Sequence, residues 1–224
     1  MGRIGKAYET KLRALLQGAR ARRLDAGLSW LAARAARLSA AESISKTDAL
    51  MRVHDELAAK LGPRNGSPPG EPRRFFCDAG LGGLARWLRG AGYEAFWEPG
   101  IDDAVLLAQA RQTATTVLTT DSLMMERRVL RDRLQPAMWL PPTLTVPEQL
   151  VLVFREFSLA PREARSMSCG GELAGADKES LRERIPPRTY RWLDEYFLCR
   201  RCGKLFWHGT HWERIQRRLK EAAA

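Results

Sequence analysis

The chain has 224 residues, of which 45% are hydrophobic, and its formal net charge at pH 7 is +11. This length holds one ordinary domain with a smaller one or with a helical extension. No stretch reaches the ~18 apolar residues of a membrane span, and no apolar run follows Met1 as in a secretory signal. The positive charge favours a polyanionic partner, and nucleic acid is preferred over an anionic membrane. A net positive charge can also act only to keep a protein soluble. We expect a cytoplasmic protein without a membrane partner.

Residues 1–61 predict a basic helical extension. Ala, Leu and Arg dominate this segment, no proline precedes Pro63, and its leucines recur at helical spacing. Residues 1–65 contain 13 Lys and Arg but only 6 Asp and Glu, so this is the most basic part of the chain. The extension is consistent with an RNA-binding arm or with a pair of helices that expose a solvated face.

A linker is expected at residues 62–72, where prolines and glycines are too dense for a helix or a strand. From residue 73 onward, short apolar runs alternate with segments of helical periodicity. Strands are expected at 74–77, 93–97, 116–119 and 137–140, and helices at 81–88, 104–111, 123–134 and 147–157. This alternation predicts an α/β domain over residues 73–160, with a parallel sheet flanked by helices.

Aspartates lie where three of the expected strands lead into helices. Asp78 follows the first strand, Asp102 and Asp103 precede the second helix, and Asp121 follows the third strand. Ligands of open parallel sheets bind outside the carboxyl ends of the strands, where clustered carboxylates favour Mg²⁺ or Mn²⁺. Each aspartate could instead be a helix N-cap, and the two roles are compatible. Successive helical residues point about 100° apart, so we expect only one of Asp102 and Asp103 to face the site.

Two arginines, Arg86 and Arg89, lie on the first helix of this domain, opposite its leucine stripe. They are candidates for contacts with nucleic-acid phosphates near Asp78, or for a solvated basic face. Cys77 lies inside an apolar strand and is expected to be a buried core residue.

Residues 161–224 predict a small metal-bound module with a C-terminal helix. Cys199-Arg-Arg-Cys202-Gly203 has the form of a zinc knuckle, in which two thiolates bracket a tight turn. Cys169 precedes it, and three of the four cysteines therefore lie close to the C-terminus. This distribution favours a metal site over a disulfide framework.

Many short motifs occur in an order that resembles the Mut-seven C-terminal RNase family, over roughly residues 73–215. They are Phe76-Cys77-Asp78, Leu84-Ala85-Arg86-Trp87-Leu88-Arg89, Asp102-Asp103, Leu118-Thr119-Thr120-Asp121, Asp177-Lys178, Ile185-Pro186-Pro187-Arg188, Asp194-Glu195, Cys199-x-x-Cys202-Gly203 and His211-Trp212. The resemblance implies a PIN-like nuclease domain with a C-terminal zinc ribbon. It also implies metal-dependent ribonuclease activity with Asp78, Asp121 and Asp102 or Asp103 as the acidic site and Arg86 near it.

The chain departs from the family pattern at three positions. Gly83 stands where the family usually has Lys, and Thr120 where it often has Arg, so two possible phosphate contacts are missing. Ser166 replaces a cysteine of the first knuckle.

The remaining thiolates, Cys169, Cys199 and Cys202, leave a tetrahedral Zn²⁺ one ligand short. His208, His211 or water could supply the fourth ligand. Alternatively, the zinc is absent and the module is held by apolar packing of Phe206, Trp207 and Trp212.

The expected fold is therefore α/β, a PIN-like parallel sheet flanked by helices, with a degenerate zinc ribbon and an N-terminal helical extension. The preferred function is metal-dependent hydrolysis of RNA by an aspartate cluster that holds Mg²⁺ or Mn²⁺. One alternative is a weakened or inactive PIN-like protein that binds RNA or ribonucleoprotein. Another is a toxin-like nuclease restrained by a protein partner, with residues 1–60 as a partner-binding surface or a cover for the site.

Overall fold

The computed structural model describes residues 3–19, 21–60, 74–132 and 134–223. The chain divides into two compact units, Met1–Pro69 with Leu140–Leu144, and Gly70–Trp139 with Thr145–Ala224. The linker expected at residues 62–72 lies outside the described residues. Within the described ranges, no helix is long and apolar enough to cross a membrane.

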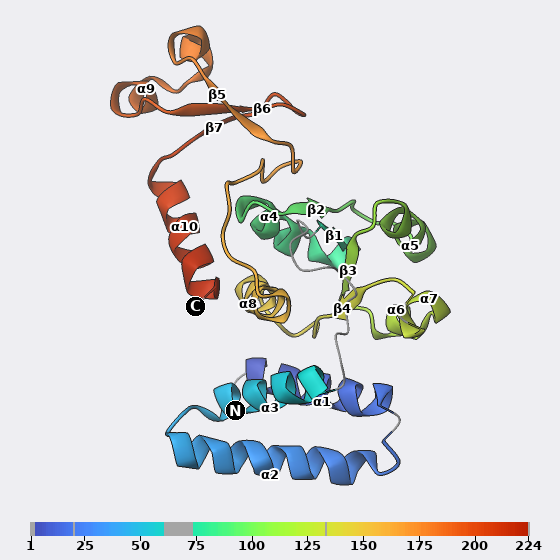
Figure 1. Ribbon diagram of the computed structural model, residues 1–224. Helices are drawn as coiled ribbons and strands as arrows, with labels where there is room; N and C mark the ends of the chain where they lie inside the picture. Colours follow the sequence, from blue (N-terminus) through green and yellow to red (C-terminus); the bar gives the residue numbers. More distant parts are fainter. Residues whose placement is uncertain (1–2, 20, 61–73, 133, 224) are drawn as a thin grey trace. The chain divides into compact units, whose positions relative to one another are not determined.

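The N-terminal unit contains three helices, α1 (Arg3–Gly18), α2 (Leu24–Glu42) and α3 (Lys46–Lys60), as Figure 1 shows. Each helix contacts the other two. Their shared core is made by residues at helical spacing, because such residues lie on one face of each helix. These core residues are Tyr8, Leu12, Leu15, Leu31, Ala35, Ala49, Leu50 and Val53. The predicted helical extension is confirmed.

The second unit is built on a sheet of four parallel strands, which confirms the predicted α/β class. The strands are β1 (Arg74–Cys77), β2 (Glu94–Phe96), β3 (Thr116–Thr119) and β4 (Ala137–Trp139). Their order in the sheet is β2-β1-β3-β4, and all three neighbouring pairs are parallel. The two central strands, β1 and β3, are almost entirely buried, as expected for a sheet covered on both faces.

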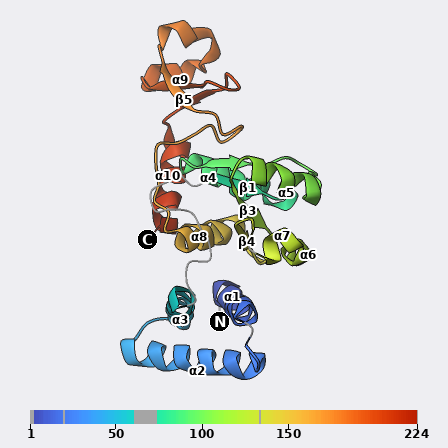
Figure 2. The same ribbon diagram turned by 45° about the vertical axis from the view of Figure 1, so that its right-hand side comes forward.

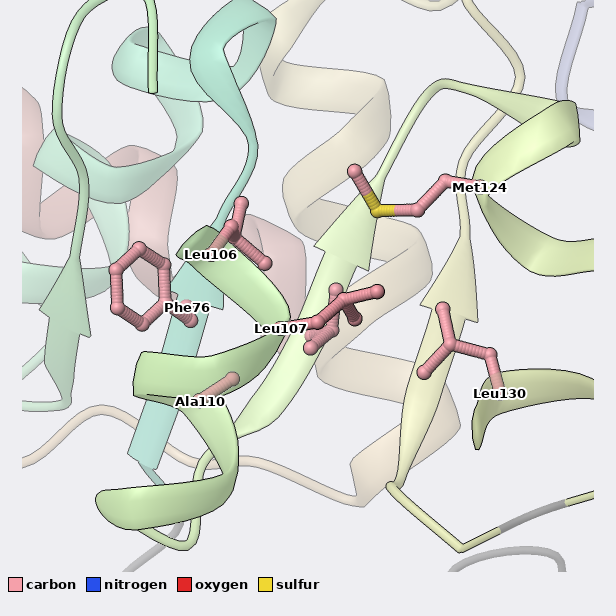
Figure 3. Packing of buried hydrophobic residues seen from close by; sticks show 7 residues of the cluster. Phe76, Leu106, Leu107, Ala110, Met124 and Leu130 are labelled. Atoms are coloured by element: carbon pink, nitrogen blue, oxygen red, sulfur yellow. The ribbon is translucent and has the colours of Figure 1, made fainter. Parts of the chain in front are cut away.

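Helices cover both faces of this sheet because consecutive strand residues point in opposite directions. Phe75 of β1 makes edge-to-face contacts with Tyr93 and with Phe157 of α8 (Val146–Phe157), which packs beside α4 (Gly82–Gly90). The next residue, Phe76, points to the other face and packs against α5 (Asp103–Gln112). Figure 3 shows the apolar cluster on this face, which consists of Phe76, Leu106, Leu107, Ala110, Val117, Met124 and Leu130.

The helix expected at 123–134 is wrong as a continuous element. The structure has two short helices, α6 (Ser122–Glu126) and α7 (Arg128–Arg131), separated at Arg127, whose ψ of 134° is not helical. The break has a packing reason, because Met124 and Leu130 both enter the same apolar cluster. In one continuous helix, residues six apart point about 120° away from each other, so only one of them would face the sheet.

The C-terminal module is a three-stranded antiparallel sheet of β5 (Leu173–Ala176), β6 (Tyr196–Cys199) and β7 (Leu205–Trp207). A 3-10 helix, η2 (Glu179–Arg184), and α9 (Pro187–Trp192) connect β5 to β6. The chain ends in α10 (Thr210–Ala223), which returns to pack against α8, as Figures 1 and 2 show. The buried core of this module is small.

Candidate functional site

The candidate acidic site lies at the point where the connections of the parallel sheet change direction. From β1 the chain runs through α4 to β2 on one side, whereas from β3 it runs through α6 and α7 to β4 on the other. Such a switch point opens a crevice outside the carboxyl ends of the two strands, where ligands of open sheets bind. Asp78 follows β1 directly, and Asp121 lies two residues beyond the end of β3.

Asp78 is buried and connects the two central strands. Its Oδ2 accepts hydrogen bonds from Thr119 Oγ1 at 2.6 Å, from the Thr120 N–H at 2.7 Å and from Thr120 Oγ1 at 3.4 Å. Among the residues that the structure describes, its Oδ1 accepts only the Gly80 N–H, at 3.1 Å, and so caps the short 3-10 helix η1 (Ala79–Leu81). The carboxylate is therefore fixed in orientation by the loop that follows β3. Thr119 is a residue of the site that the sequence reasoning missed.

Asp121 and Asp102 are helix caps, as the alternative interpretation of these acids predicts. Asp121 Oδ1 accepts the Leu123 N–H at 2.7 Å, and Asp102 Oδ1 accepts the N–H groups of Ala104 and Val105 at 2.8 and 3.3 Å. Within the described part of the chain, no donor reaches the other oxygen, Oδ2, of Asp121. Capping therefore leaves that oxygen available to a ligand.

Asp103, one residue further along α5, is in a different setting from Asp102. Its Oδ2 lies 3.4 Å from a guanidinium nitrogen of Arg127, whereas Asp102 is exposed and caps the helix. Arg127 is the residue at which α6 and α7 separate, and the helix predicted across it concealed this contact. Of the two adjacent acids, Asp103 is the one held by a cation.

The aspartates do not gather into a compact cluster. In the described ranges, the group of metal-ligating side chains whose ligand atoms all lie within 4.8 Å of one another consists of Cys169, Cys199 and Cys202. The acids are instead distributed along the carboxyl edge of the sheet.

The two candidate arginines of α4 have different environments. Arg86 is exposed, but Arg89 is only 5% exposed, so the solvated face and the phosphate contact expected for Arg89 are not what the structure shows. Its Nε donates to the carbonyl of Ala95 at 2.7 Å and its Nη1 to the carbonyl of Ser168 at 2.9 Å. Burial lowers the pKa of Arg89. Arg89 thus joins α4 to β2 and to the cysteine-containing loop.

The family pattern has a lysine at position 83 and an arginine at position 120, where this chain has Gly83 and Thr120, and the two positions have different surroundings. A Cβ atom built on Gly83 would lie 2.8 Å from Cγ2 of Val146, the first residue of α8. A lysine at this position therefore requires Val146 to move. Thr120, in contrast, is half-buried and uses both its N–H and its hydroxyl on Asp78.

The three late cysteines form a cluster with the dimensions of a zinc site. The Sγ atoms of Cys169 and Cys199 are 3.4 Å apart, and all three Sγ atoms lie within 4.8 Å of one another. Tetrahedral zinc with metal–sulfur bonds of about 2.3 Å places its sulfurs about 3.8 Å apart. Ser166 Oγ, in a fully buried residue, lies 3.5 Å from the Sγ of Cys169 and 3.9 Å from that of Cys202. The cluster could therefore hold a metal such as zinc, with Ser166 at the fourth vertex.

The backbone around the cluster favours the thiolate form that metals require. Burial raises the pKa of the Cys199 thiol, but the N–H groups of Cys202 and Arg201 and the neighbouring thiols together lower it to about 6. Gly203 has φ 65° and donates its N–H to the Cys199 carbonyl at 2.9 Å, which closes the predicted turn. At Gly171, a Cβ would lie 2.6 Å from the Cys199 sulfur, so this position excludes any side chain.

The two histidines proposed as the fourth ligand do not belong to the cysteine group. His208 instead lies between the rings of Phe197 and Trp212, at centroid distances of 4.7 and 5.4 Å, and its Nδ1 is 3.4 Å from a carboxylate oxygen of Glu195. His211 is exposed in the first turn of α10. The structure therefore does not place His208 or His211, the ligands expected from the sequence, with the three cysteines.

Comparisons with known proteins assign this part of the chain to a family. The family model of the Mut7-C RNAse domain matches residues 73–219, which include both the sheet and the cysteine-containing module. Searches of curated proteins and of solved structures return no match. Since the family model spans more than half of the chain, the chain belongs to the Mut7-C RNAse domain family.

Proposed function

We propose that the protein is a metal-dependent ribonuclease of PIN-like architecture that hydrolyses phosphodiester bonds of RNA. The observation that carries this proposal is the position of Asp78 and Asp121 at the carboxyl ends of β1 and β3, at the switch point of the sheet. Membership of an RNase family supports RNA as the substrate. Asp103 is the third acid of the proposed site.

The residues present fit Mg²⁺ or Mn²⁺. Both ions prefer oxygen ligands, and Mg²⁺ is usually held by one or two carboxylates together with water and substrate phosphates rather than by a closed protein cage. Oδ2 of Asp121 has no donor among the described residues, and Oδ1 of Asp78 accepts a single bond at 3.1 Å. When bound, the metal would polarise the phosphate and lower the pKa of a water molecule.

The chain's own residues would position the substrate and the acids. Thr119 and Thr120 hold the Asp78 carboxylate in one orientation, so its other oxygen is aimed without reorganisation. Arg86, exposed on the helix that begins four residues after Asp78, would contact the RNA backbone as a positioning charge. Arg127 would fix Asp103.

The test is cleavage of a labelled single-stranded RNA with and without added Mg²⁺ or Mn²⁺, by the wild type and by Asp121→Asn. Asparagine caps helices as well as aspartate does, so this change removes the charge and keeps the start of α6. We expect the variant to lose more than about 100-fold in rate, because a metal supplies several kcal/mol of stabilisation to the transition state. Its thermal unfolding should be unchanged.

Asp132→Asn is the matched control. Asp132 pairs with Arg128 and Arg131 on the surface, at the end of α7 that leads to the amino end of β4, and its loss should not change the rate. Metal-dependent cleavage that persists in Asp121→Asn would contradict the proposed mechanism.

A second candidate function is RNA or ribonucleoprotein binding without catalysis. It is favoured by Gly83 and Thr120, which remove two possible phosphate contacts, and by the use of Asp78, Asp102 and Asp121 as helix caps. Tight RNA binding with no cleavage under either metal would favour this candidate over the nuclease.

A further inference from the structure

A cavity of about 620 Å³ lies in the C-terminal module, and its size is within the range of ligand sites, about 300–1,000 Å³. We call it the ribbon pocket. Its walls come from the three strands β5 to β7, from α9 and from the start of α10, and Arg86 of α4 reaches it as well. The proposed acidic site uses none of these walls except the helix that carries Arg86.

Aromatic rings form much of the ribbon pocket. Trp192, the last residue of α9, lines it and is 78% exposed, which is unusual for a side chain of this size. Phe197, His208 and Trp212, which also line the pocket, form a run of rings, and the planes of the last two differ by only 9°. A flat ligand could continue this stack. Nucleobases bind single-strand proteins in this way, because every base has a π-face.

The charge of the ribbon pocket is entirely basic. Arg86, Arg165, Arg188 and Lys204 line it, and none of the described lining residues is acidic. Within the described chain, none of these four cations forms an ion pair. Arg165 and Lys204 are hydrogen bonded to neutral partners, the carbonyl of a glycine and the hydroxyl of a serine. Unpaired cations around an aromatic cavity favour a ligand that carries both rings and negative charges.

We propose that the ribbon pocket binds unpaired bases of single-stranded RNA, which stack on Trp192 and the neighbouring rings while the cations hold the adjacent phosphates. A duplex offers no free base faces for this stacking, so the pocket selects single strands. This assignment rests on the proposed function for the identity of the nucleic acid and specifies its strand state. Because α4 borders the pocket through Arg86 and begins four residues after Asp78, the bound strand would lead toward the acidic edge.

The test measures the affinity of the full-length chain for a labelled single-stranded RNA of about 12 nucleotides by fluorescence anisotropy. The buffer contains no Mg²⁺ or Mn²⁺, so that binding is measured without cleavage. It also contains no chelator, so that the cysteine cluster keeps its metal. We expect Trp192→Ala to weaken binding on the order of tenfold and Trp192→Phe to weaken it much less, because phenylalanine retains a stacking face. Trp30→Ala, at a tryptophan of α2 that is 56% exposed and does not line the pocket, is the control and should bind as the wild type does.

Two further measurements complete the test. Arg188→Ala should weaken binding uniformly across sequences and reduce the slope of log K against log salt by about 0.7, as expected for one phosphate contact with a single strand. A duplex of the same sequence should bind more weakly than the single strand. Equal binding by Trp192→Ala and the wild type, or equal affinity for duplex and single strand, would overturn the proposal and leave the pocket to another ligand, such as a peptide.

The outcome is independent of the nuclease proposal. Trp192-dependent binding without cleavage under any metal would support the pocket and contradict the nuclease. Metal-dependent cleavage by a protein whose RNA affinity does not depend on Trp192 would overturn the pocket and retain the nuclease.

Discussion

The aspartates at the sheet edge and the cysteines of the C-terminal module are two candidate metal sites of opposite construction. The aspartates are spread along the carboxyl ends of strands, and three of them already accept backbone N–H groups as helix caps. The cysteines are drawn together by two turns until their sulfurs lie within 4.8 Å. The acids are thus stable without a metal, whereas clustered thiolates need a cation to offset their mutual repulsion.

The apolar core of the parallel sheet is also larger than that of the C-terminal module. The parallel sheet has an extensive apolar core on both faces, whereas among the described residues the buried members of the small sheet's core cluster are Leu181, Ile185 and Tyr196. A core of that size contributes little against the entropy of ordering the module. We therefore expect the sheet to fold without metal and the C-terminal module to depend on the cysteine cluster.

The largest expected effect comes from Cys199→Ala. Loss of one of three thiolates should abolish zinc binding, and structural zinc contributes on the order of 10 kcal/mol in small zinc-binding peptides. Zinc content measured after purification should fall from one ion per chain to none. By hydrogen exchange, amides of β5 to β7 should lose protection while those of β1 and β3 keep theirs. Cys77→Ala, in the buried strand β1, should retain the zinc.

If the wild type contains no zinc and the amides of β5 to β7 are still protected from exchange, the C-terminal module does not depend on a metal and the contrast with the parallel sheet fails. Apolar packing would then hold the module, as the alternative from the sequence proposes.

The next effect separates the two arginines of α4. Arg89→Ala removes two short hydrogen bonds that a buried guanidinium donates. The carbonyls of Ala95 and Ser168 lose this donor. We expect a loss of about 2–4 kcal/mol in the free energy of unfolding, measured with denaturant. Arg86→Ala, on the exposed side of the same helix, should change stability by less than about 0.5 kcal/mol. Similar losses in both variants would contradict the structural role of Arg89.

A smaller effect is expected when the family lysine is restored. Gly83→Lys gains about 0.7–1 kcal/mol in helix propensity but forces a Cβ against Val146, and overpacking of this kind costs about 1–3 kcal/mol. The net change should be a destabilisation of about 1–2 kcal/mol, seen as a lower midpoint of thermal unfolding. The double variant with Val146→Ala should be less destabilised by the lysine. A Gly83→Lys protein as stable as the wild type would show that Val146 does not exclude a side chain here.

The smallest effect concerns the fourth vertex of the cysteine cluster. Ser166→Cys replaces a hydroxyl by a thiolate at a position 3.5 and 3.9 Å from two sulfurs. We expect zinc to bind on the order of tenfold more tightly, about 1.4 kcal/mol, in competition with a chelator. Ser168→Cys, two residues away and exposed, should not change the affinity. An unchanged affinity in Ser166→Cys would show that residue 166 is not at the vertex.

The sequence predicted much of this molecule because its signals are local. Alternating apolar runs predict the four strands of the parallel sheet and most of its helices, but not β5 to β7 of the C-terminal module, and Asp78, Asp102 and Asp121 are identified as residues at helix starts. The prediction failed where a residue's role depends on a distant partner. Helical periodicity predicts a surface position for Arg89, because periodicity alone does not show that α4 also meets the loop at Ser168.

The break at Arg127 was missed for the same reason, because it follows from packing of both Met124 and Leu130 against the sheet. The family pattern indicates residue 166 as the position of a missing cysteine, but only the structure shows that the Ser166 hydroxyl lies 3.5 and 3.9 Å from the sulfurs of Cys169 and Cys202.

The sequence by itself determined the fold class, the family and the types of ligand atom, because period, turn residues and motif order are properties of short segments. Only the tertiary structure decided that β1 and β3 are neighbours and that the Asp78 carboxylate accepts a hydrogen bond from Thr119. It also decided that aromatic and basic side chains enclose a pocket. These features depend on strand order and on contacts between segments far apart in the chain, and such contacts are fixed by packing of the whole unit.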